Sequence, residues 1–131
     1  GGGKVGLVVA ESLRKRGAEV AIVEEDKRLA GDVMPSFKWR HSAWVEELEI
    51  RTFLSARATR ITAEGVHVAS AKGETFVPAD TVIAAGPRKS NQSLFRDFEW
   101  MIDELHGCGA ALMPRGLDAA IQEGYRLGVR I

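Results

Sequence analysis

The chain opens with Gly1-Gly2-Gly3-Lys4-Val5-Gly6, in which three glycines follow the spacing G-x-G-x-x-G. In a turn between a strand and a helix, the first glycine permits a tight bend and the second lets a diphosphate approach the backbone. The third lets the helix pack closely on the sheet. The N–H groups that open the helix then face the anion, with the positive end of the helix dipole behind them. The spacing predicts a dinucleotide-binding turn with contacts at Gly1, Gly3 and Gly6.

The residues after these glycines come in the order that such a turn requires. Apolar residues recur at helical spacing over residues 4–16, and Gly17 is a natural helix stop. Residues 20–23 are a short β-branched run, typical of a buried parallel strand. Glu24 follows it, roughly 20 residues after the glycines, where an acid accepts hydrogen bonds from ribose hydroxyls. The alternative interpretation of the glycine triplet is a linker without structure, and the strand that would lead into Gly1 is absent from this sequence.

The rest of the chain alternates helical and extended patterns. The predicted helices are residues 36–48, with Ser36 as the cap, and residues 117–127. The apolar residues that recur in residues 4–16 are Val5, Val8, Val9 and Leu13. The expected inner face of residues 36–48 is Phe37, Trp44, Val45 and Leu48. In residues 117–127, one face carries Leu117, Ala120, Ile121 and Tyr125. The predicted extended segments are residues 50–54, a meander of short pieces at 58–63, 66–69 and 75–78, and a buried strand at 80–87 that ends in a turn at Gly86. Residues 88–114 show no strong periodicity.

Composition excludes several classes of protein. The 131 residues carry no formal net charge, which argues against a nucleic-acid binder that neutralises phosphates. We find no apolar run long enough to span a bilayer and no signal peptide. Cys108 is the only cysteine, which favours a cytoplasmic location. The three histidines and Cys108 lack zinc-site spacing, so we predict no metal ligand, and no side chain is marked as catalytic.

The order of these segments resembles the NAD(P)H-binding domain of the pyridine-nucleotide–disulfide oxidoreductase superfamily. The segments that carry this resemblance are the glycine loop, the Val20–Glu24 strand, the meander and Ala79-Asp80-Thr81-Val82-Ile83-Ala84-Ala85-Gly86. The tail from Pro114 to Tyr125 and the Arg28–Asp32 loop look like one branch, the NADH:flavin oxidoreductases related to 2,4-dienoyl-CoA reductase and trimethylamine dehydrogenase. In that branch an FMN barrel and an iron–sulfur cluster precede a split FAD domain that contains the NAD(P)H domain.

The resemblance implies an α/β, Rossmann-like three-layer fold with a parallel sheet and an antiparallel β-meander, lacking its leading strand. Residues 1–88 would be the NAD(P)H-binding domain, and residues 89–131 a remnant of the C-terminal part of an FAD-binding domain. Gly1, Gly3 and Gly6 would meet the pyrophosphate, Glu24 the adenosine ribose, and Gly86 the nicotinamide half. The family's Gly-Asp motif, whose Asp contacts FAD, has its nearest match in His106-Gly107-Cys108, so FAD is expected only in the context of a larger protein.

Two functions follow from this resemblance. In the first, the chain positions a reduced nicotinamide for hydride transfer to a flavin held largely elsewhere, with NAD favoured over NADP because Glu24, Glu25 and Asp26 repel a 2′-phosphate. In the second, the chain is a non-catalytic module that binds ADP or serves assembly. A methyltransferase, which also uses a glycine turn followed by an acid, fits the position of Gly6 poorly. We also expect an exposed sheet edge, covered by the rest of a larger oxidoreductase, by a partner chain or within a homo-oligomer.

Overall fold

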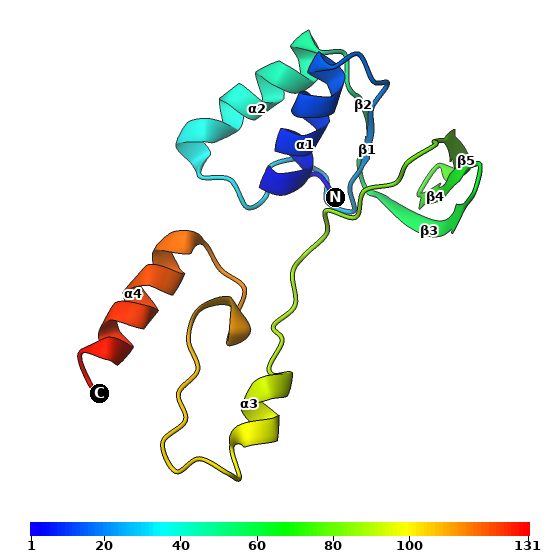
Figure 1. Ribbon diagram of the computed structural model, residues 1–131. Coiled ribbons are helices and arrows are strands. Elements are labelled where there is room, and N and C mark those ends of the chain that lie inside the picture. The colour runs from blue at the N-terminus through cyan, green and yellow to red at the C-terminus, as the bar shows by residue number, and fades with distance from the viewer. The chain divides into compact units, whose positions relative to one another are not determined.

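The chain divides after Gly86 into two units, and the computed structural model describes all of residues 1–131. The first unit, Gly1–Gly86, contains two helices and five strands (Figure 1). In chain order they are α1 (Lys4–Lys15), β1 (Ala21–Val23), α2 (Pro35–Glu47), β2 (Arg51–Phe53), β3 (Ala56–Thr62), β4 (Gly65–Ser70) and β5 (Gly73–Pro78).

The first unit has three layers, built on the alternation of side chains along β1. Strands β1 and β2 pair in parallel, with Ile22 opposite Thr52. On one face of this pair, Ile22 belongs to an apolar cluster with Leu7 and Ala10 of α1. On the other face, Ala21 and Val23 pack against a second cluster in the antiparallel sheet of β3, β4 and β5. Helices therefore cover one face and the antiparallel sheet the other (Figure 1), which is the expected α/β, Rossmann-like arrangement.

Helix α1 occupies the predicted range, and of its four recurring apolar residues Val9 and Leu13 are half-buried while Val5 and Val8 are exposed. Leu7 and Ala10 are buried, whereas Val5 is 54% exposed and Val8 is 47% exposed. The glycine loop decides this rotation, because Gly6 lies against the backbone of Gly1 and brings the next residue, Leu7, toward the sheet.

Helix α2 begins one residue earlier than predicted, and Ser36 is not its cap. Met34 occupies the cap position and Pro35 the first helical position, where the fixed φ of proline suits the helix and its missing N–H costs nothing. Val45 and Leu48 pack against the core as expected, but Phe37 is 56% exposed. The buried residue of α2 is instead His41, whose ring meets that of Trp44 edge-on.

The predicted meander is confirmed as a sheet of order β3-β4-β5 with both pairings antiparallel. Its buried core is formed by Ala56, Val66, Val68 and Val77. The register of β3 against β4 shifts between Ala58 and Arg60, a β-bulge of the kind that increases local twist.

The predicted strand at residues 80–87 was wrong. The segment is extended but forms no strand, and Val82 and Ile83 are 41% and 49% exposed. A parallel strand requires a neighbour that supplies hydrogen bonds along its edge. Strand β1 pairs only with β2, and residues 81–85 pair with no strand.

The second unit, Pro87–Ile131, contains α3 (Ser93–Phe98), the short 3₁₀ helix η1 (Gly109–Ala111) and α4 (Leu117–Gly128). Helix α4 confirms the prediction at residues 117–127, and its apolar residues Leu117, Ile121 and Tyr125 are exposed. Helix α3 was not predicted, because six residues are too few to show a helical period. No helix of the chain has both the length and the apolar character needed to cross a membrane.

Candidate functional site

The glycine loop is held in a close backbone arrangement at the start of α1. A Cβ atom at Gly6 would overlap the carbonyl oxygen of Gly1, and one at Gly1 would lie 2.5 Å from the carbonyl oxygen of Ala85. Both neighbours are backbone atoms, which cannot turn aside as a flexible side chain can. The structure thus gives Gly1 and Gly6 the steric roles that the motif predicts, a tight turn and a close helix approach.

Gly3 lacks a side chain for a different reason. A Cβ atom at Gly3 would lie 3.0–3.2 Å from the carboxylate atoms of Asp32. The space above the first turn of α1 is therefore already taken by an acidic side chain. The backbone amide of Lys4 donates a hydrogen bond to Oδ1 of Asp32 at 2.7 Å.

Glu24 lies at the mouth of the loop, as predicted. Its Oε2 accepts a hydrogen bond from the Gly2 amide at 2.5 Å, and its Oε1 accepts one from the Asp26 amide at 2.9 Å. Burial alone would raise the pKa of the Glu24 carboxyl. Hydrogen bonds from the Asp26 and Gly2 amides lower that pKa below its ordinary value. The carboxylate is therefore ionised at neutral pH, and each oxygen keeps a lone pair for a further donor.

Gly86 lies beside the loop, since a Cβ atom at Gly1 would stand 3.1 Å from the Gly86 nitrogen. A Cβ atom at Gly86 itself would meet nothing within 4 Å. The structure therefore brings the five predicted contact residues, Gly1, Gly3, Gly6, Glu24 and Gly86, into one region of the first unit. It offers no steric reason for glycine at position 86.

An open cleft of about 650 Å³ lies beside Glu24. Its lining comes mostly from the loop after β1, Glu25–Leu29, and includes Lys38 of α2 and Ser55. This volume falls within the range of about 300–1,000 Å³ found for small-molecule pockets. The cleft carries acids at Glu25 and Asp26 and bases at Lys27, Arg28 and Lys38, so it is polar and of mixed charge.

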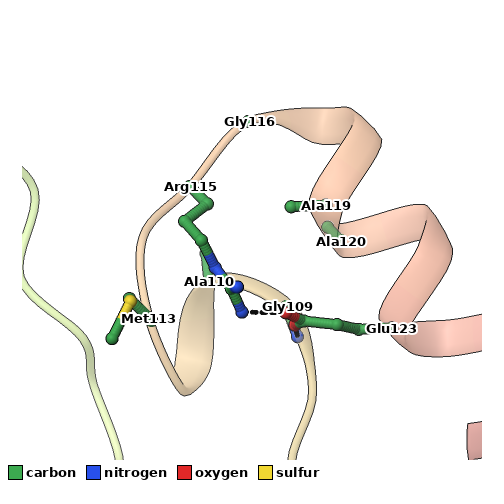
Figure 2. Close-up of a pocket in the computed structure, with 8 residues that line it drawn as sticks. All are labelled: Gly109, Ala110, Met113, Arg115, Gly116, Ala119, Ala120 and Glu123. Carbon is green, nitrogen blue, oxygen red and sulfur yellow. Dashed lines mark hydrogen bonds and ion pairs between the residues drawn. The ribbon is translucent and has the colours of Figure 1, made fainter. Parts of the chain in front are cut away.

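The second unit has a hollow between η1 and α4, shown in Figure 2. Glu123 of α4 closes it by pairing with the Arg115 guanidinium and by accepting a hydrogen bond from the Gly109 amide at 2.9 Å. The hollow has no room for a water molecule. We therefore interpret it as a packing contact that fastens η1 to α4 and assign it no ligand.

The structure groups no three His, Cys, Asp or Glu side chains in a way that could hold a metal ion. Cys108 is exposed. His67 is half-buried in β4, with its ring tilted against that of Phe76. The Nε2 atom of His106 lies 3.4 Å from Oε1 of Glu104. The chemistry that the structure assembles is backbone N–H groups, a helix N-terminus and carboxylates.

Sequence reasoning missed two residues of this region. Gly2 is buried, and a Cβ there would overlap the Leu29 side chain, yet the motif leaves that position free. Asp32 reaches the Lys4 amide across 28 positions of sequence, so no local spacing relates the two. The Arg28–Asp32 loop was noted only for its family likeness.

Comparison with known proteins agrees with this geometry. A family model described as pyridine nucleotide-disulphide oxidoreductase matches residues 1–107. The chain is 26% identical over 112 residues to the metal reductase of Desulforamulus reducens, covering 86% of this chain and 17% of that protein. It is 25% identical over 128 residues to the bilirubin reductase of Mediterraneibacter gnavus, covering 95% of this chain and 20% of that protein.

Among solved structures, a complex of 2-naphthoyl-CoA reductase with 2-naphthoyl-CoA matches the whole chain with a TM-score of 0.90 and 26% sequence identity, covering 20% of that protein. The chain thus spans about a fifth of the length of the proteins to which it is similar. The family model covers most of the chain, from the glycine loop to Gly107, and the first unit has the fold of a Rossmann-like redox-domain fragment. The chain therefore belongs to the pyridine nucleotide-disulphide oxidoreductase family.

Proposed function

We propose that the chain is the dinucleotide-binding portion of an NAD(P)H-dependent flavin oxidoreductase. It binds the reduced nicotinamide dinucleotide and orients it toward an FAD held largely by other segments of a larger protein. The observation that carries this proposal is the contact of the Glu24 carboxylate with the Gly2 amide, at 2.5 Å. It places an ionised acid beside the glycine loop, where a ribose would meet the acid and its diphosphate the loop.

The residues of the first unit fit such a ligand. The backbone at Gly1 and Gly6 has no space for Cβ atoms, so no side chain of these two residues would separate a diphosphate from the loop backbone at the positive end of α1. Glu24 would accept hydrogen bonds from ribose hydroxyls, and the cleft beside it has room for an adenosine. Gly86 would lie on the nicotinamide side. When bound, the nicotinamide supplies the hydride; this chain's residues bind and orient it.

The relatives support the assignment to a reductase. Three similar proteins are named for different substrates: a metal, bilirubin and 2-naphthoyl-CoA. A portion shared by reductases of such different substrates is better suited to binding an electron donor than to substrate recognition. The match with a CoA-thioester reductase along the whole chain also favours the NADH:flavin oxidoreductase branch. In that branch, residues 89–131 would belong to the end of the FAD domain.

Glu24 also favours NAD over NADP. Two amides hold its carboxylate and lower its pKa, so a negative charge stands where the 2′-phosphate of NADP would lie. Lys27, Arg28 and Lys38 line the cleft nearby and reduce the repulsion. We therefore expect a preference for NADH of roughly tenfold, equivalent to about 1.4 kcal/mol.

The test is a calorimetric titration of the 131-residue chain with NADH, NADPH and ADP, each measured separately. Saturable binding of NADH, tighter than that of NADPH, supports the proposal. Equal binding of NADH and NADPH would remove the role of Glu24 in selecting the cofactor. If none of the three binds, the proposed function is wrong.

One observation favours a second function, a non-catalytic module that binds ADP. Residues 81–85, which lead into Gly86 on the expected nicotinamide side, form no strand, and their apolar side chains Val82 and Ile83 are exposed. A chain with this region incomplete could hold the adenosine diphosphate half alone. Binding of ADP with the same affinity as NADH would support this module, because the nicotinamide half would then contribute nothing.

We also propose that another polypeptide segment covers the free edge of β1. That edge has no strand partner, and unpaired strand edges are normally covered or paired. The segment would come from the rest of a larger oxidoreductase or from a second copy of the chain. Sedimentation of the isolated chain as a stable monomer at high concentration would exclude the second copy.

A further inference from the structure

The N-terminus of α1 already holds an anion, the side chain of Asp32. The Lys4 amide donates a hydrogen bond to Oδ1 of Asp32 at 2.7 Å. Both carboxylate oxygens of Asp32 lie within 3.0–3.2 Å of the place where a Cβ of Gly3 would stand. Helix α1 has no acidic residue in its first turn, and its cap, Gly3, has no side chain. Asp32 is therefore the acid that neutralises this helix end.

The fold holds Asp32 in this place from both sides. The Ala30 amide donates a hydrogen bond to the Gly2 carbonyl at 2.8 Å, and the Val33 amide donates one to the Ala30 carbonyl at 3.1 Å. Ala30 and Val33 are 2% and 7% exposed, so the turn that carries Asp32 is anchored in the core. Asp32 itself is exposed to solvent, so its side chain has open space on one side.

Under the proposed function, the same helix end receives the diphosphate. The first N–H groups of a helix have no partner within it, and in a G-x-G-x-x-G turn they face the pyrophosphate. The Lys4 amide is one of these groups, and Asp32 occupies it. A diphosphate that binds here therefore needs the Lys4 amide as a donor, and that amide is already hydrogen-bonded to the negatively charged Asp32 carboxylate.

We infer that Asp32 is an internal competitor for the diphosphate: it caps α1 in the free chain and must turn away when the dinucleotide binds. This inference rests on the proposed function. Asp32 thereby lowers the affinity of the loop for any ligand that carries a diphosphate. It leaves the adenosine end untouched, because the cleft beside Glu24 is not lined by Asp32.

The test uses the full chain with Asp32→Asn and Asp32→Ala, titrated with ADP and with adenosine. The asparagine variant keeps the shape and an acceptor oxygen but removes the charge; the alanine variant removes both. We expect both variants to bind ADP roughly two- to fivefold more tightly than the unmodified chain, the range set by one exposed charge at a helix end. The affinity for adenosine should change by less than roughly twofold. Glu19→Gln is the matched control, because it removes one exposed negative charge between α1 and β1, beyond the other end of the helix.

The outcomes separate this inference from the proposed function. If the unmodified chain binds ADP and the Asp32 variants bind it equally or more weakly, Asp32 does not compete, and the proposed function stands. If Glu19→Gln tightens ADP binding as much as Asp32→Asn, the effect is one of net charge and the inference is wrong. If neither the unmodified chain nor any variant binds ADP, the proposed function and this inference both fail. Hydrogen exchange at the Lys4 amide gives a ligand-free check: Asp32→Ala should accelerate it, and an unchanged rate would contradict the contact.

Discussion

Replacing Gly6 by alanine sets two physical effects against each other. In a helix interior, alanine is favoured over glycine by about 1 kcal/mol, so propensity alone predicts a more stable protein. The structure predicts the opposite. The new Cβ would overlap the Gly1 carbonyl oxygen and lie 3.1 Å from the Gly1 carbonyl carbon. Gly1 cannot simply retreat, because the backbone of Ala85 lies close behind it.

The size of the effect follows from these contacts. Overpacking a close contact costs about 1–3 kcal/mol. A shift of the loop also strains the bond from the Gly2 amide to Glu24, one of a class worth about 1.5–3 kcal/mol when the acceptor is charged. Because Glu24 is only partly buried, we discount the second contribution and expect a net destabilisation of roughly 1–3 kcal/mol. For a unit of this size, that lowers the melting temperature by at least roughly 4 °C.

Two assays test this prediction. Thermal unfolding of Gly6→Ala is monitored by circular dichroism, and the affinity of the variant for ADP is measured by titration. Ser12→Ala is the matched control, because it introduces alanine at an exposed position of the same helix and should not lower the melting temperature. We expect ADP binding to Gly6→Ala to weaken roughly tenfold, the equivalent of about 1.4 kcal/mol. A Gly6→Ala chain that melts higher than the unmodified chain and binds ADP normally would refute the reasoning.

Three further predictions follow from named contacts. Glu24→Gln should weaken ADP binding, whereas Glu19→Gln, which removes an exposed charge outside the cleft, should not; calorimetry distinguishes them. The pKa of the Glu24 carboxyl is lower in the folded chain than its ordinary value of 4.5, so the ionised carboxylate stabilises the fold above pH 4.5. This stabilisation disappears as pH falls through the lower, folded pKa. The urea midpoint of Glu24→Gln should therefore depend less on pH below pH 4.5 than that of the unmodified chain. Val68→Ala, at the fully buried centre of the antiparallel sheet, should lower the free energy of unfolding by about 1–3 kcal/mol; a smaller loss in urea unfolding would mean that the sheet packs loosely.

Local sequence patterns were sufficient for most elements of the first unit. The glycine spacing, the Gly17 stop and the meander turns gave α1 and the antiparallel sheet close to their observed bounds. The inner face of α1 was not predictable from periodicity, because two sets of apolar residues show helical spacing. Leu7 and Ala10 form the buried set, and Val5 and Val8 form the exposed set. The contact of Gly6 with the Gly1 backbone, which is not a side-chain property, decides between them.

The failure at residues 80–87 has another cause. Apolar and β-branched composition reports that a segment suits a strand, but a strand exists only where a neighbour supplies its hydrogen bonds. The candidate site shows the same division. Glu24 was predictable from its distance to the glycines, whereas the contact between Asp32 and the Lys4 amide depends on how the loop after β1 folds back to α1.

The most direct test of the central claim is a titration of the ¹⁵N-labelled chain with NADH, in which the chemical shift of each backbone amide is measured by NMR. We predict saturable shifts that are largest at Gly2, Gly3 and Lys4 and in the loop Glu25–Leu29, since these amides surround the diphosphate and adenosine positions. Absence of shifts at Gly2–Lys4 at saturating NADH, or shifts confined to Pro87–Ile131, would contradict the claim that the glycine loop and Glu24 hold the dinucleotide.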